Sequence, residues 1–102
     1  MYDATFEPET NALVIRIKGS FSFEYTPEFK RQIKEAIGSM QYKKFIADLS
    51  GLTYIDSSGL GSLFHMKNSI DKIGGEMLIR SIPERIIEVF KSSGFYNVFN
   101  II

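Results

Sequence analysis

Two apolar patterns alternate from residue 44 to the end of the chain, and this alternation restricts the fold more than any other feature of the sequence. The run KKFIADL is short and apolar, which is typical of a strand covered on both faces, and EMLIRS is predicted to be the next strand. A segment with helical spacing of apolar residues follows each run, and FYNVFNII closes the chain as a last strand or extended segment. A strand–helix–strand–helix–strand order predicts right-handed crossovers and therefore parallel pairing.

A hairpin is predicted ahead of this alternation. Tyr2 to Phe6 and Ala12 to Lys18 have strand patterns and are joined through the turn-forming residues Pro8, Thr10 and Asn11. The hairpin makes the expected sheet mixed, with four to five strands and the helices packed on it. Since no repeat, low-complexity tract or linker interrupts the chain, we expect one α/β domain over residues 1–102.

Capping residues indicate where three predicted helices begin and end. Thr26 is expected to cap the first helix. The second begins near Ser57 and stops at Gly74-Gly75, and the third begins at a capping-box spacing, Ser81 to Glu84, and stops at Gly94. The apolar face of the first helix is predicted to consist of Phe29, Ile33, Ala36, Ile37 and Met40.

The composition argues against several functional classes. Twelve acidic and 12 basic residues cancel, whereas broad attraction to nucleic acid or anionic membranes needs clustered Lys and Arg. The absence of cysteine excludes disulfides, thiol nucleophiles and thiolate metal sites. With no signal peptide and no apolar run near about 18 residues, we expect a cytoplasmic protein.

The stretch TYIDSSGLGS links a buried strand to the second predicted helix. Partners and ligands of open α/β sheets gather at such carboxyl ends of strands. Asp56 is placed to accept hydrogen bonds from N–H groups at the helix start, with Ser57 and Ser58 in the first turn pointing outward. Gly59 and Gly61 are expected to expose backbone that a partner could approach closely.

Several roles compete for this stretch, and the simplest is a cap and turn without further function. A nucleophilic serine lacks a Gly-x-Ser-x-Gly elbow, and the single histidine, His65, lies about 10 Å further along the helix axis. The Gly59-Leu60-Gly61 run completes neither a dinucleotide nor a Walker fingerprint. One histidine and scattered carboxylates give no metal-ligand spacing, so neither a metal nor another cofactor is expected.

Phosphorylation is the remaining alternative. A phosphoryl group on Ser58 would place about −1.5 to −2 charges at a helix N-terminus, which favours anions. Asp56 would partly oppose that gain by repulsion. The fold should therefore persist while the surface changes, and such a switch acts on a partner.

The run FIADLSGLTYIDSSGLGSLFHMKNSIDKIGGEMLI closely resembles the STAS-domain family of anti-sigma-factor antagonists. In that family an aspartate-led strand end, a short loop, Asp-Ser-Ser-Gly-Leu-Gly and a helix ending in Gly-Gly recur in this order. VIRIKGSFSFEYTPEFKRQI and VFKSSGFYNVFNI look like the second strand with the first helix, and the third helix with the final strand. The resemblance implies a single STAS-like domain.

The resemblance also implies partner switching. An unphosphorylated antagonist binds an anti-sigma factor that is a serine kinase and holds ATP, which frees the sigma factor for transcription. Phosphorylation ends the association until a serine phosphatase restores the hydroxyl. The antagonist itself is not an enzyme and is expected to be monomeric when free. Carried over to this sequence, the phosphoacceptor is Ser58 and the partner-binding residues are Asp56, Ser57, Gly59, Leu60, Gly61 and Ser22.

Several points stay open at the level of sequence. Ser22 stands where many family members carry an aspartate, and the aromatic residues Phe21, Phe23 and Tyr25 either form an apolar partner surface or fold onto the sheet edge. The same switch could serve a non-sigma partner, such as a sensory scaffold or secretion control. A STAS domain that binds a small ligand is a further alternative.

Overall fold

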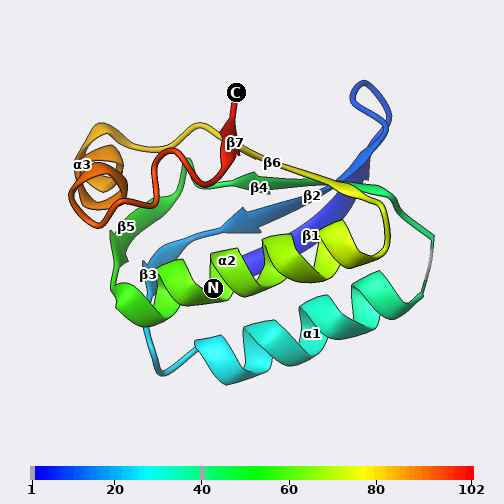
Figure 1. The fold of residues 1–102 in the computed structure, drawn as a ribbon, viewed down its shortest axis with the longest axis horizontal. Helices are drawn as coiled ribbons and strands as arrows, with labels where there is room; N and C mark the ends of the chain where they lie inside the picture. Colours follow the sequence, from blue (N-terminus) through cyan, green and yellow to red (C-terminus); the bar gives the residue numbers. More distant parts are fainter. Residues whose placement is uncertain (1, 40) are drawn as a thin grey trace.

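A mixed five-stranded sheet forms the centre of the protein, in a computed structural model that describes residues 2–39 and 41–102 (Figure 1). The strand order is β1-β2-β4-β6-β7. β1 pairs antiparallel with β2, and every other neighbouring pair is parallel, which confirms the predicted hairpin and α/β fold. The five strands are β1 (Tyr2–Glu7), β2 (Ala12–Ile17), β4 (Lys44–Asp48), β6 (Glu76–Arg80) and β7 (Asn100–Ile101).

Within the described residues, three helices pack on one face of this sheet. Each parallel strand is added beside the previous one, and right-handed crossovers then put every connecting helix on the same side. Figure 1 shows α1 and α2 side by side along the sheet and α3 at one end. None of the helices in the described ranges is long and apolar enough to cross a membrane. The helices are α1 (Thr26–Gly38), α2 (Ser57–Lys72) and α3 (Glu84–Ser92).

The main core lies between these helices and the sheet. All three helices contribute to one cluster of buried side chains, which also takes alternate residues of the strands. The predicted apolar face of α1 is confirmed for Phe29, Ile33 and Ile37, which are buried, and Ala36 packs against the cluster. Met40 lies outside the described residues. Fully buried members include Ile15, Phe45, Leu63, Ile70, Ile79 and Phe90.

A second, two-stranded sheet was not predicted. β3 (Gly19–Phe21) pairs in parallel with β5 (Leu52–Ile55), where the sequence suggested irregular connections. The Gly19 N–H donates to the Gly51 carbonyl at 2.9 Å, and Gly19 has a φ of 74° that suits glycine. β3 follows β2 and β5 follows β4, so this pair continues beyond the ends of those two strands. β5 leads into the first residue of α2 and so positions the start of that helix.

Two predicted caps are wrong. Thr26 lies inside α1, and its hydroxyl donates to the Phe23 carbonyl instead of capping the helix. The capping box before α3 does not form either, because Ser81 adopts a φ of 59° and the helix begins only after Pro83. The stop after α2 is confirmed. Gly74, at a φ of 74°, donates to Asp71, and the next N–H closes on Ile70, as in a Schellman motif.

Candidate functional site

The start of α2 is fixed by the Asp56 side chain, as the sequence predicts. Asp56 has extended backbone, and its Oδ1 accepts a hydrogen bond from the Gly59 N–H at 2.9 Å. Its Oδ2 accepts from the Phe23 N–H at 3.2 Å. One carboxylate therefore holds both the first turn of α2 and the loop after β3.

The two adjacent serines occupy the first two positions of α2. Ser57 is exposed and Ser58 is half-buried, and neither hydroxyl makes a hydrogen bond within the described residues. Their N–H groups lie ahead of the first intrahelical bond, which runs from the Leu60 N–H to the Asp56 carbonyl. An anion on either hydroxyl would thus meet the positive end of the helix.

The two glycines of the motif have different surroundings. Gly59 is buried, and an added Cβ would lie 2.3 Å from the Phe21 carbonyl oxygen and 2.8 Å from Ile55 Cγ1. Gly61 has nothing within 4 Å of an added Cβ. The predicted exposure of backbone is therefore wrong for Gly59, whose lack of a side chain lets α2 approach β3. At Gly61 the space beside the helix is open.

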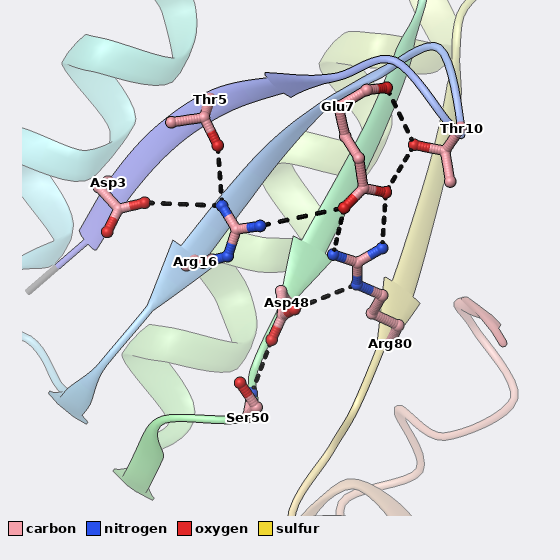
Figure 2. Close-up of polar contacts among 8 residues, drawn as sticks. All are labelled: Asp3, Thr5, Glu7, Thr10, Arg16, Asp48, Ser50 and Arg80. Carbon is pink, nitrogen blue, oxygen red and sulfur yellow. Dashed lines mark hydrogen bonds and ion pairs between the residues drawn. The ribbon is translucent and has the colours of Figure 1, made fainter.

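A second polar cluster lies on the helix-free face and was missed by the sequence analysis (Figure 2). The Arg80 guanidinium donates to both carboxylate oxygens of Glu7 at 2.9 Å, and its Nε donates to Asp48 at 3.1 Å. Asp48 also accepts from the Ser50 N–H at 3.0 Å. The Thr10 hydroxyl donates a hydrogen bond to the Glu7 carboxylate at 2.8 Å. The cluster fixes the turn between β4 and β5, and β5 leads into Asp56.

Charged partners shift the pKa values in this cluster. Hydrogen bonds from Arg80 and then Thr10 lower the pKa of Glu7 from 4.5 to about 2. Burial raises the pKa of Asp48, but hydrogen bonds from Ser50 and Arg80 outweigh it and the net shift is downward. The hydrogen bond to Glu7 raises the pKa of Arg80 further above its ordinary range. All three groups stay charged near neutral pH, as expected of a structural ion network rather than of an acid–base pair.

A comparison with known protein families identifies the family of this chain. Residues 3–102 match the sequence model of the STAS domain. The chain belongs to the STAS domain family. That assignment confirms the resemblance carried by the motif from Asp56 to Gly61 and extends it over nearly the whole sequence.

Relatives of this STAS domain include regulators of sigma factors. The anti-sigma F factor antagonist of Paenibacillus polymyxa is 26% identical over 95 residues, which cover 93% of this chain and 81% of that protein. The anti-sigma factor antagonist SpoIIAA in its unphosphorylated form superposes with a TM-score of 0.77 at 17% identity, covering 100% and 87% of the two chains. SpoIIAA of Bacillus in the phosphorylated form gives 0.75 at 19% identity, covering 100% and 91%. Both SpoIIAA structures have the same fold as this chain.

Two predicted contact residues of the STAS domain are hidden. Leu60 is 2% exposed and belongs to the main core, and Ser22 is 7% exposed. Their side chains are turned inward by α2 and the loop after β3, so they do not offer a side chain to a partner in this structure. The partner-binding roles stay predictions for all six residues, Asp56, Ser57, Gly59, Leu60, Gly61 and Ser22.

Exposed aromatic side chains lie near Asp56 in the sequence or in the loop that its carboxylate holds. Phe21 is buried, whereas Phe23 is 67% and Tyr25 is 38% exposed, so the loop aromatics divide between core and surface. Tyr54, 54% exposed on β5, was missed because that strand was not predicted. A large apolar side chain left in water indicates an interaction site when several gather together. We call the group Phe23, Tyr25, Tyr54, Ser57 and Ser58 the Asp56 surface.

Proposed function

We propose that this STAS domain is an anti-sigma-factor antagonist whose partner binding is controlled by phosphorylation of Ser58. The observation that carries the proposal is the half-buried Ser58 hydroxyl, which makes no hydrogen bond in the described chain and lies on a helix start fixed by Asp56. The name of the Paenibacillus relative and the phosphorylated form of SpoIIAA support it. Such an antagonist works in the cytoplasm, where sigma factors act.

The unphosphorylated domain binds an anti-sigma factor through the Asp56 surface, and the sigma factor is released to RNA polymerase. Phe23 and Tyr54 supply apolar contact area, and the two serines and Asp56 supply polar contacts. The partner is also a serine kinase. It holds ATP and transfers the γ-phosphoryl group to the Ser58 oxygen, which loses its proton as ADP leaves.

Phosphorylation ends binding by changing charge rather than fold. The phosphoryl group adds about −1.5 to −2 charges and three acceptor oxygens. The N–H groups at the start of α2 stabilise this anion, so the helix persists. The added charge lies next to the aromatic contact area and repels acidic or apolar partner groups. A serine phosphatase hydrolyses the phosphoester and restores the hydroxyl.

Affinity capture from the native host tests this proposal with an exposed serine outside the Asp56 surface as the control. Wild-type, Ser58→Ala and Ser92→Ala baits should capture a serine kinase, and Ser58→Asp should lose it at least tenfold, as judged by mass spectrometry. The free energy of unfolding of Ser58→Asp should differ from that of wild type by less than about 1 kcal/mol, because an acid is tolerated at a helix start.

Three outcomes would count against the switch. One is equal capture by all baits, and another is parallel loss of stability and binding in Ser58→Asp. The third comes from incubating the captured kinase with ATP, if the phosphoryl group is found on Ser57 instead of Ser58. Capture of a kinase that binds no sigma factor would keep the switch and move it to a different pathway.

A further inference from the structure

A cavity lies between the first strands and the start of α1, apart from the Ser58 hydroxyl. Its volume is about 190 Å³. That is below the range of about 300 to 1,000 Å³ common for sites that hold whole small molecules. The cavity therefore suits a single functional group on a short stem rather than a nucleotide.

Aromatic rings form much of the wall. Tyr2, Phe21, Tyr25 and Phe29 all line the cavity. The Phe29 ring meets Tyr2 edge-on with centroids 5.2 Å apart, and it meets Phe21 in the same way at 4.9 Å. These contacts hold three of the four rings in place, so the wall is preformed.

The Tyr2 hydroxyl is an unusual group in this wall. Its oxygen is buried and has no hydrogen-bond partner among the described residues, whereas most buried hydroxyls are paired. Burial and then the nearby Glu28 carboxylate raise the pKa of Tyr2, which keeps the phenol neutral and able to donate or accept. Because this oxygen is closed off from solvent, the Tyr2 ring rather than its hydroxyl forms the wall of the cavity.

The charged residues of the wall decide whether the cavity favours a positive or a negative ligand group. Glu24 and Glu28 both line the cavity, and Glu24 has no ion pair in the described part of the chain. Glu28 shares Arg31 with Glu35, at 3.4 and 3.1 Å. Lys18 also lines the cavity, but its ammonium lies 3.5 Å from Asp3, a carboxylate outside the wall. The carboxylates outnumber the cations that offset them.

We propose that this cavity binds a cationic group, an ammonium or guanidinium, between the aromatic rings and the carboxylates of Glu24 and Glu28. Ring faces attract cations, and a carboxylate beside them strengthens the attraction. The cation donates to the Glu24 carboxylate and lies against the rings. The same chemistry is offered by a Lys or Arg side chain of a protein and by a free amine. The cavity shares Tyr25 with the Asp56 surface, but the inference does not depend on phosphorylation of Ser58.

Titration of the ¹⁵N-labelled protein tests the site. The probes are an acetylated, amidated Gly-Arg-Gly peptide, its citrulline counterpart, which is neutral and nearly the same shape, and n-butylamine. We expect saturable amide shifts at Ser20, Tyr25 and Gln32 with the arginine peptide or the amine, and at least tenfold weaker binding of the citrulline peptide. Tighter binding of the peptide indicates a protein side chain as the natural occupant, and tighter binding of the amine indicates a small molecule.

Variants separate this site from a general surface effect. Glu24→Gln should weaken binding at least fivefold, whereas Glu88→Gln, an exposed change on α3, should leave it unchanged. Equal binding of the citrulline peptide, no saturable shifts, or wild-type affinity in Glu24→Gln would overturn the proposal.

Discussion

At the scale of single residues, the Asp56 carboxylate joins the two segments that carry the exposed side chains of the site. One oxygen caps α2 through Gly59, and the other holds the loop after β3 through the Phe23 N–H. The position of Phe23 relative to the serines therefore depends on a single side chain. Any change at Asp56 acts on helix stability and on loop position together.

Replacement of Asp56 should show both effects. Asp56→Ala should lower the free energy of unfolding by about 0.5 to 2 kcal/mol through loss of the cap. Asp56→Asn should cost less, because its one oxygen can still cap α2, although its NH2 group cannot accept from the Phe23 N–H. Urea unfolding measures the first effect, and hydrogen exchange at the Phe23 amide measures the second, with faster exchange expected in Asp56→Ala. Wild-type stability of Asp56→Ala would show that the cap contributes nothing.

The two glycines of the motif offer a matched pair of substitutions. Alanine gains up to about 1 kcal/mol over glycine in a helix interior. Gly61→Ala should realise much of this gain, because its Cβ meets open space. Gly59→Ala should instead destabilise the domain by about 1 to 3 kcal/mol, since its Cβ would overlap the Phe21 carbonyl. Thermal unfolding of both variants checks the signs, and equal shifts would contradict the packing described for Gly59.

At the scale of elements, the sequence predicted what depends on local pattern. Asp56 was recognised as a cap because donor and acceptor are three residues apart. β4 and β6 were recognised because their apolar runs are covered on both faces. The third helix was placed correctly, although its capping box was not, since a positive φ at Ser81 cannot be inferred from composition.

Elements that depend on distant partners were missed. β3 and β5 are three and four residues long and pair with each other across about 30 residues of chain, so no periodicity could reveal them. The burial of Leu60 and Ser22 has the same origin, because it depends on where β3 lies against α2. The exposure of the Tyr54 side chain likewise depends on β5, which was not predicted. Motif resemblance located the site, but only the packing shows which of its side chains reach solvent.

At the scale of the whole molecule, the helix-free face of the sheet is closed by charges over a small apolar cluster. Ala12, Val14 and Ile46 are fully buried there, with Leu78 packed against them. In the pairing register, Glu7 lies beside Ala12, and Arg80 lies beside Asp48, on the same face. Arg80 joins the first strand to the fourth strand of the sheet order through two hydrogen bonds to Glu7.

This link predicts an acid sensitivity. The folded-state pKa of Glu7, about 2, lies below its ordinary value of 4.5, so the unfolded chain binds more protons between these values. The contribution of Glu7 is therefore fully present above pH 4.5 and is lost as the pH falls towards 2. Urea unfolding between pH 7 and 2 should show a shallower fall for Glu7→Gln than for wild type.

Glu9→Gln, an exposed change in the neighbouring turn, serves as the control for this acid sensitivity and should follow wild type. Glu7→Gln should also be less stable than wild type at pH 7, because Arg80 loses a charged partner. Identical pH profiles for Glu7→Gln and wild type would mean that the pair does not couple folding to protonation.

The strand order of the main sheet has a consequence for synthesis. Because the order in space follows the order in the chain, a nascent polypeptide leaving the ribosome can add each strand to the edge formed by the previous one. No later strand has to insert between earlier ones. Glu7 and Asp48, however, wait for Arg80, which is 73 residues beyond Glu7. The hairpin is made early with Arg16 beside Asp3 and Glu7, and the closer partner of Glu7 and Asp48 arrives only when most of the domain has been translated.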